Sequence, residues 1–131
     1  MLLIDTHVLV WLDEGNLRLG AEALRRIDRS HQSNTLAVSA ITFWETAMLV
    51  QKGRLSIAPP LTLWRKELLI NGLIEIPVTG DIALAAGTLE NFHGDPADRI
   101  IAATALIHDA TLLTADKKIL AWSSVQAVDA N

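Results

Sequence analysis

Short apolar segments alternate with longer amphipathic segments along this chain, and this alternation constrains the fold more than any other feature of the sequence. Five segments have the length and composition of buried strands: residues 1–4, 35–40, 74–78, 111–115 and 124–130. Helical patterns separate them, at residues 6–15, 20–32, 41–53, 61–73, 79–91, 98–108 and 116–122. Such alternation predicts a three-layer α/β/α domain with a central, mostly parallel sheet of about five strands.

Composition limits the classes of protein to which the chain can belong. Its 131 residues, half of them hydrophobic, suit one domain over residues 1–131 with a substantial core. The chain has no cysteine, which excludes disulfides and thiolate metal sites and fits a cytoplasmic protein. The N-terminus lacks a secretory pattern, and no apolar run approaches the roughly 18 residues of a membrane span. We therefore expect no membrane association.

Asp5 interrupts the apolar opening MLLIDTHVLVW. A charge so close to a predicted core must be paired, neutralised or bound to a metal. Asp5 directly follows the first predicted strand, and parallel sheets bind their ligands at the carboxyl ends of strands. The alternative role is an N-cap of the next helix, although Thr6 is also suited to that position. Position alone does not separate the two roles.

Glu45 and Asp116 also lie where strands lead into helices. Asp116 directly follows the segment TLLTA, where it is also suited to cap a helix. Glu45 lies near the start of the helix after the second strand. On a helical wheel it shares a side with Thr42 and Thr46, away from a wide apolar arc. Taken alone, Glu45 has the pattern of a solvent-facing residue.

Asp98 opens a predicted helix after the loop GDPAD, and the local sequence offers a complete structural explanation for it. Asp95 is suited to the N-cap, Pro96 to the first helical position, and Asp98 to the acidic third position of a capping box. Because Asp95 can cap the helix alone, Asp98 is also free for another task.

In a parallel domain these four acids can converge at one edge of the sheet. Four carboxylates repel one another unless their pKa values rise or a cation binds among them. Ligands that are all oxygen atoms suit Mg²⁺ or Mn²⁺ rather than Zn²⁺, and the histidines lack zinc-site spacing. The net charge of −4 equals that of the four acids, because eleven other acidic residues balance eleven Lys and Arg. We therefore predict a metal site at Asp5, Glu45, Asp98 and Asp116.

The segments LLIDTHVLVW, WETAML, GDPADRIIAATA and LLTADKKI, in this order, resemble the PIN-domain ribonucleases, specifically the VapC-type toxins of toxin–antitoxin pairs. The resemblance implies a PIN fold and a Mg²⁺- or Mn²⁺-dependent endoribonuclease with these four acids as catalytic and metal-binding residues. It also implies a supporting role for Thr114. Many relatives have a further acid where this chain has Lys118, so the sequence leaves one or two metal ions open.

The resemblance further implies partners. VapC-type toxins cleave RNA, inhibit growth, commonly form homodimers, and are held inactive by a VapB-like antitoxin that covers the site. Trp11, Trp44, Met48 and Trp64 are candidates for an exposed apolar groove, although they can equally be core residues. Thr6 is a further candidate for supporting the site. Candidate RNA contacts include Arg99, Lys117 and the basic stretches 18–29 and 52–66, whose alternative role is a solvated helix face.

Two other classes are compatible with the alternating pattern. A receiver-like phosphoacceptor domain has a similar length and carries acids at strand ends, but it needs paired acids after the first strand, where this chain has Thr6 and His7. A non-catalytic, PIN-like RNA-binding module is the other alternative. The intact set of four acids favours the enzyme.

Overall fold

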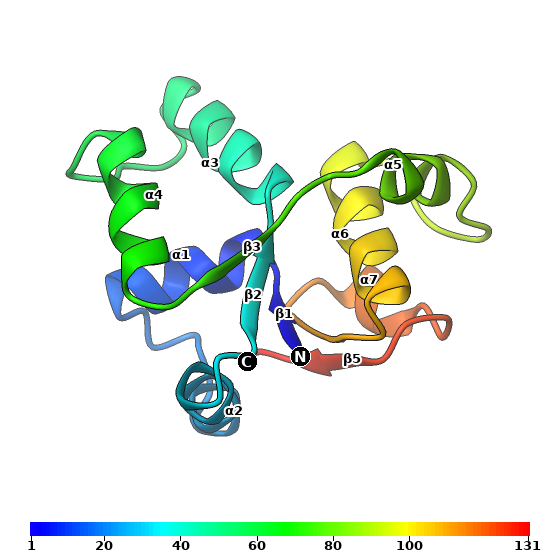
Figure 1. Cartoon of the computed structure of the whole chain (residues 1–131), viewed down its shortest axis with the longest axis horizontal. Helices are drawn as coiled ribbons and strands as arrows, with labels where there is room; N and C mark the ends of the chain where they lie inside the picture. Colours follow the sequence, from blue (N-terminus) through cyan, green and yellow to red (C-terminus); the bar gives the residue numbers. More distant parts are fainter.

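The computed structural model describes residues 1–131 and contains one five-stranded sheet with helices on both faces (Figure 1). The strands are β1 (Leu2–Ile4), β2 (Leu36–Ser39), β3 (Ile74–Ile76), β4 (Thr111–Thr114) and β5 (Ala127–Asp129). The helices are α1 (Thr6–Glu14), α2 (Ala21–Gln32), α3 (Ile41–Gln51), α4 (Leu61–Ile70), α5 (Gly80–Gly87), α6 (Pro96–Ile107) and α7 (Lys117–Ala121). Every pair of neighbouring strands is parallel, which confirms the predicted α/β/α class.

The strand order is β3-β2-β1-β4-β5, with β1 at the centre. The chain runs from β1 outward to β2 and β3, then crosses to β4 and β5 on the other side. The connection that follows β1 leads to β2 on one side, whereas the connection that follows β4 leads to β5 on the other side. Such a switch in strand order leaves a crevice at the carboxyl ends of the two strands, β1 and β4. The order also differs from the 2-1-3-4-5 order of receiver-type folds, so the receiver alternative is wrong.

The two faces of the sheet bury separate apolar cores, and alternation along β1 divides its side chains between them. Leu3 lies in the core that α5, α6 and α7 cover, whereas Leu2 and Ile4 lie in the core that α1, α2 and α4 cover (Figure 1). None of the three is more than 5% exposed. Because both faces are buried, the position of β1 is firmly fixed, and with it the residue that follows.

Most predicted elements are present with boundaries that differ by a few residues. The predicted stop of the first helix is confirmed, because Gly15 ends α1 with a positive φ of 65°, a conformation that glycine adopts without strain. No helix combines the length and apolarity that crossing a bilayer requires. One boundary differs more clearly: α5 ends at Gly87, whereas the sequence pattern predicts a helix to residue 91.

Residues 88–95 form a loop instead, here called the 88–95 loop, and Arg99 of α6 holds it. The Arg99 guanidinium donates hydrogen bonds to the carbonyl oxygens of Ala86, Leu89, Phe92 and His93, at 2.9, 3.1, 3.1 and 3.2 Å. The Trp122 indole N–H donates to the carbonyl oxygen of Glu90 at 3.1 Å. Side chains from α6 and the end of α7 thus replace the backbone partners that a longer α5 would supply.

We expect Arg99→Lys to lower the free energy of unfolding by about 2–3 kcal/mol, because an ammonium group cannot reproduce the planar fork and leaves loop carbonyls without donors. Urea unfolding followed by circular dichroism measures this change. The matched control is Arg25→Lys, since Arg25 is exposed and pairs only with Glu22 on its own helix. That control should change stability by no more than about 0.5 kcal/mol. Equal stability of the two variants would contradict a structural role for Arg99.

Candidate functional site

Asp5 lies buried at the carboxyl end of β1, with 3% of its surface exposed. It is the N-cap of α1, since its Oδ1 accepts a hydrogen bond from the Thr6 N–H at 2.8 Å. Its Oδ2 accepts a hydrogen bond from the Thr114 hydroxyl at 2.7 Å. Burial raises the pKa of Asp5, and these two hydrogen bonds partly oppose that rise. Asp5 therefore caps the helix, while each oxygen keeps a second acceptor position for another partner.

Thr114, the last residue of β4, connects Asp5 to Asp116. Its hydroxyl oxygen accepts a hydrogen bond from the Asp116 N–H at 3.0 Å, which leaves the hydroxyl hydrogen for Asp5. Asp116 caps α7, where its Oδ1 accepts from the Lys118 N–H at 2.8 Å. The order of strands brings these residues together although more than a hundred positions separate them in the sequence. The predicted supporting position of Thr114 thus has a direct geometric basis.

Glu45 reaches the site from α3. The side of this helix that carries Glu45 packs through two buried threonines: the Thr42 hydroxyl lies 3.0 Å from the Thr6 hydroxyl, and the Thr46 hydroxyl donates to the Thr42 carbonyl. Glu45 itself is partly buried, and its Oε1 is buried without a hydrogen-bond partner. Burial raises the pKa of Glu45, the nearby Thr6 hydroxyl partly opposes this rise, and the negative charge of Asp5 adds to it. A buried acceptor without a donor is costly, and a bound cation would relieve that cost.

Asp98 does not complete a capping box. Asp95 caps α6, with its Oδ1 accepting a hydrogen bond from the Asp98 N–H at 3.0 Å. The Asp98 carboxylate instead lies against His93, with 2.7 Å between Oδ2 and Nε2 and 15% of the side chain exposed. Burial, together with the charges of Asp5, Asp95 and Asp116, raises the pKa of Asp98 to about 6, although the hydrogen bond with His93 partly opposes the rise. The local sequence therefore explains the cap, whereas Asp98 is directed toward the other acids.

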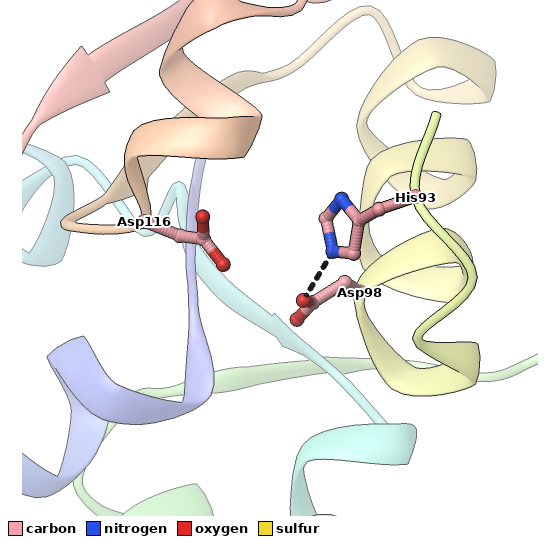
Figure 2. A group of neighbouring side chains, drawn as sticks. All are labelled: His93, Asp98 and Asp116. Carbon is pink, nitrogen blue, oxygen red and sulfur yellow. Dashed lines mark hydrogen bonds and ion pairs between the residues drawn. The ribbon is translucent and has the colours of Figure 1, made fainter. Parts of the chain in front are cut away.

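Asp98 is the shared member of two groups of closely spaced ligand atoms, each group lying within 4.8 Å. The first group is His93, Asp98 and Asp116, and the second is Glu45, Asp95 and Asp98. Figure 2 shows the first group, in which the three side chains point toward one another from the 88–95 loop, α6 and the start of α7. Asp5 belongs to neither group, although its charge raises the pKa of both Glu45 and Asp98.

The residues present fit a divalent cation. Carboxylate oxygens dominate the donor set, which suits Mg²⁺ or Mn²⁺. Three of the acids have raised pKa values because ionised neighbours and burial disfavour their charged forms, and a cation reverses that preference. The buried, unpartnered Oε1 of Glu45 is an acceptor that such an ion would use. The arrangement can therefore hold a metal ion and place it beside a polar pocket.

This pocket, of about 540 Å³, opens from Asp5 and Asp116 along α1. His7, Trp11 and Arg18 line it, and the Arg18 guanidinium lies 5.9 Å from the centre of the Trp11 ring. Cationic and aromatic groups thus lie next to the acids.

The sequence pattern did not predict two neighbours of the acids, His93 and Asp95, and it predicted an RNA contact at Arg99. His93 is absent from the predicted site and Asp95 is predicted only as a cap, yet both have ligand atoms close to those of Asp98. Their sequence proximity to Asp98 is the one signal that could have indicated them. Arg99, a predicted RNA contact, has its guanidinium engaged with carbonyls of the 88–95 loop, and these contacts do not support that role. Lys117 is exposed beside Asp116, where an RNA contact stays a prediction.

Of the four side chains predicted to form an apolar groove, Trp64 is 3% exposed and belongs to the core, whereas Trp44 is 53% exposed. Trp11 and Met48 are partly buried. The indole N–H of Trp64 donates to Asp13, so this tryptophan joins α4 to α1. The set therefore does not form one exposed surface.

Comparison with known proteins agrees with this fold. A family model for the PIN domain matches residues 2–123. Ribonuclease VapC22 of Mycobacterium tuberculosis is 35% identical over 118 residues, which cover 89% of this chain and 88% of that protein. Among solved structures, a chain of VapBC2 from Rickettsia felis, bound to a promoter DNA fragment, superposes with a TM-score of 0.74 at 18% identity over 99% of this chain and 98% of that one. A toxin–antitoxin complex from Klebsiella pneumoniae gives 0.68 at 23% identity, over 98% and 96% of the two chains. The match of the PIN-domain family model to residues 2–123 shows that this protein belongs to the PIN-domain family.

Proposed function

We propose that this protein is a metal-dependent endoribonuclease that acts as the toxin of a toxin–antitoxin pair. The observation that carries the proposal is the set of carboxylates around Asp98, directed into one space at the carboxyl ends of β1 and β4. The relative that is 35% identical is a ribonuclease, and the structural neighbours include toxin–antitoxin complexes. These similarities support the reaction type and the kind of partner.

In this proposal Asp5, Glu45, Asp98 and Asp116 hold Mg²⁺ or Mn²⁺. Such an ion lowers the pKa of a bound water and offsets negative charge on the phosphodiester and on the leaving oxygen. The chain supplies the placement. Thr114 orients one oxygen of Asp5 and fixes the backbone of Asp116 through the same hydroxyl. The contact between the Thr6 and Thr42 hydroxyls holds α1 against α3, and thereby positions Glu45.

The pocket along α1 supports RNA as the substrate. Arg18 can contact a phosphate, and Trp11 offers an aromatic surface of the kind on which bases stack. Lys117, the residue after Asp116, is an exposed cation. These groups lie next to the acids, so a strand bound in the pocket would bring a phosphodiester to the metal.

An apolar groove supports an antitoxin as the partner. It has a volume of about 200 Å³ and lies among α1, α2, β2 and α4, with Leu12, Ile27, Leu68 and Leu73 in its lining. An apolar side chain of a VapB-like antitoxin can insert into a groove of this size. We further expect a homodimer that acts in the cytoplasm, where its RNA substrates and translation are found.

Purified protein should cleave single-stranded RNA with Mg²⁺ or Mn²⁺ and lose this activity in the presence of a chelator. We expect Asp5→Asn and Asp98→Asn to lower the cleavage rate by at least about a hundredfold, because each removes a charged ligand at the metal. Asp81→Asn is the matched control, since Asp81 is an exposed acid in the first turn of α5. If Asp5→Asn and Asp98→Asn cleave RNA as well as Asp81→Asn does, the proposed enzyme is overturned. If wild type binds RNA but does not cleave it, the non-catalytic module is favoured.

Without metal, the wild-type free energy of unfolding should fall as the pH rises from about 4 to about 6. The pKa of Asp98 is raised from 3.8 to about 6 in the folded state, so the folded protein holds this proton more strongly than the unfolded chain. The resulting stabilisation is full below the unfolded pKa and is lost as the pH passes the folded one. Asp98→Asn cannot ionise, so this variant should lose less stability over that range and exceed wild type at pH 7.

Urea unfolding of chelator-treated protein at several pH values tests this expectation, with Asp81→Asn as control. Adding Mg²⁺ at pH 7 should make wild type more stable than Asp98→Asn, because wild type would bind the ion more tightly. A ligand at a hundred times its Kd stabilises the protein that binds it by about 2.7 kcal/mol. Parallel pH profiles for wild type and Asp98→Asn would show that repulsion at Asp98 is not significant.

Bacteria that produce the protein without its partner should stop growing, whereas cells that produce Asp98→Asn at the same level should grow normally. The physical reason is uncontrolled RNA cleavage, which the variant cannot perform. Growth curves after induction, with protein levels compared by immunoblot, measure the effect. Unimpaired growth with active wild-type enzyme in the cell would count against the toxin role while leaving the ribonuclease activity intact.

A further inference from the structure

His93 is the one nitrogen donor among the side chains gathered at Asp98. Its Nε2 lies 2.7 Å from Asp98 Oδ2, and both side chains are mostly buried, at 20% and 15% exposed. Figure 2 shows the ring edge turned toward the space between Asp98 and Asp116. The imidazole therefore faces the same space as the carboxylates.

The chain fixes the His93 ring in this position. The ring stacks on Phe92, with 4.4 Å between centroids, and Phe92 in turn meets Trp122 edge to face at 4.8 Å. Arg99 holds the carbonyl oxygens of Phe92 and His93, and it directly follows Asp98 on α6. The first turns of α6 thus carry Asp98 and also hold the backbone of His93 through Arg99, so little conformational freedom remains for the relative position of the two side chains.

The spacing of the ligand atoms suits a shared ion. Ligands at about 2.1 Å from an octahedral ion lie about 3 Å apart when adjacent and about 4.2 Å apart when opposite. The ligand atoms of His93, Asp98 and Asp116 all lie within 4.8 Å of one another. The three therefore need only small movements to surround one ion, and the contact between His93 and Asp98 occupies the space of an adjacent pair.

We propose that His93 is a nitrogen ligand of the cation at Asp98 and that it gives the site a preference for Mn²⁺ over Mg²⁺. Imidazole suits first-row transition metals, whereas Mg²⁺ is held almost wholly by oxygen. The inference rests on the proposed metal dependence, but it concerns a residue outside the four acids. The competing role for His93 is a hydrogen-bond partner that orients Asp98 without touching the metal.

Pulsed electron paramagnetic resonance of wild-type protein loaded with Mn²⁺ separates these roles, because a coordinated imidazole produces nitrogen modulation from its ¹⁴N nucleus. We expect this modulation in wild type, its loss in His93→Gln, and its persistence in His7→Gln. His7 is the matched control, because it lines the pocket next to Asp5 and is the other imidazole near the acids. Since the signal is read in wild type and in His7→Gln, the test holds even if His93→Gln does not fold.

Metal affinities measured by titration calorimetry provide a second readout that does not depend on catalysis. His93→Gln should weaken Mn²⁺ binding by at least about tenfold, since even outer-shell partners of metal ligands contribute about 10–100-fold, and it should weaken Mg²⁺ binding less. Bound Mn²⁺ without nitrogen modulation in wild type, or an equal loss for both ions in His93→Gln, would overturn the role of His93 while leaving the metal site intact. Absence of any Mn²⁺ or Mg²⁺ binding by wild type would overturn the proposed metal dependence itself.

Discussion

A buried carboxylate at the end of the central strand is the constraint on which the site depends. Asp5 follows β1, which two apolar cores hold from both faces, so this carboxylate cannot move into solvent. Its two hydrogen bonds come from the first turn of α1 and from the end of β4. The hydrogen bond from Thr114 also joins the carboxyl ends of β1 and β4, the two strands at the switch in strand order. The neighbouring contacts of Thr114 and Thr6 also place Asp116 and the helix that carries Glu45.

Each of the other acids is positioned by a different contact. Glu45 depends on the contact between the Thr6 and Thr42 hydroxyls, which joins α3 to α1, whereas Asp116 depends on the Thr114 hydroxyl. Asp98 depends on Asp95, which caps α6 and so frees the neighbouring carboxylate. The result is an accumulation of negative charge that burial makes unfavourable, with the pKa values of Asp5, Glu45 and Asp98 raised together. A bound cation would offset this repulsion, so the unfavourable energy would be present only in the metal-free protein.

The alternation of strands and helices was predictable because the spacing of apolar residues along the sequence indicates which side chains are buried. In this fold both faces of the sheet are buried. The positions of Asp5 and Asp116 followed from that prediction, since both acids directly follow strands. The end of α5 was not predictable, because the guanidinium of Arg99 holds the carbonyls of the 88–95 loop and the sequence pattern carries no sign of that contact. The contact of His93 with Asp98 escaped prediction for the same reason: it depends on how this loop folds back.

The acids that cap helices have an additional electrostatic effect. Asp5 and Asp95 cap α1 and α6, so the amino ends of two helices of nine and twelve residues lie at the acid cluster. The partial positive charge of these helix ends lowers the energy of nearby anions without adding a cationic side chain that would compete for the carboxylates. The backbone itself thus moderates the repulsion among the acids. The same helix ends would also favour an incoming phosphate, so peptide dipoles would share with a bound cation the task of balancing the charges of the substrate and the acids.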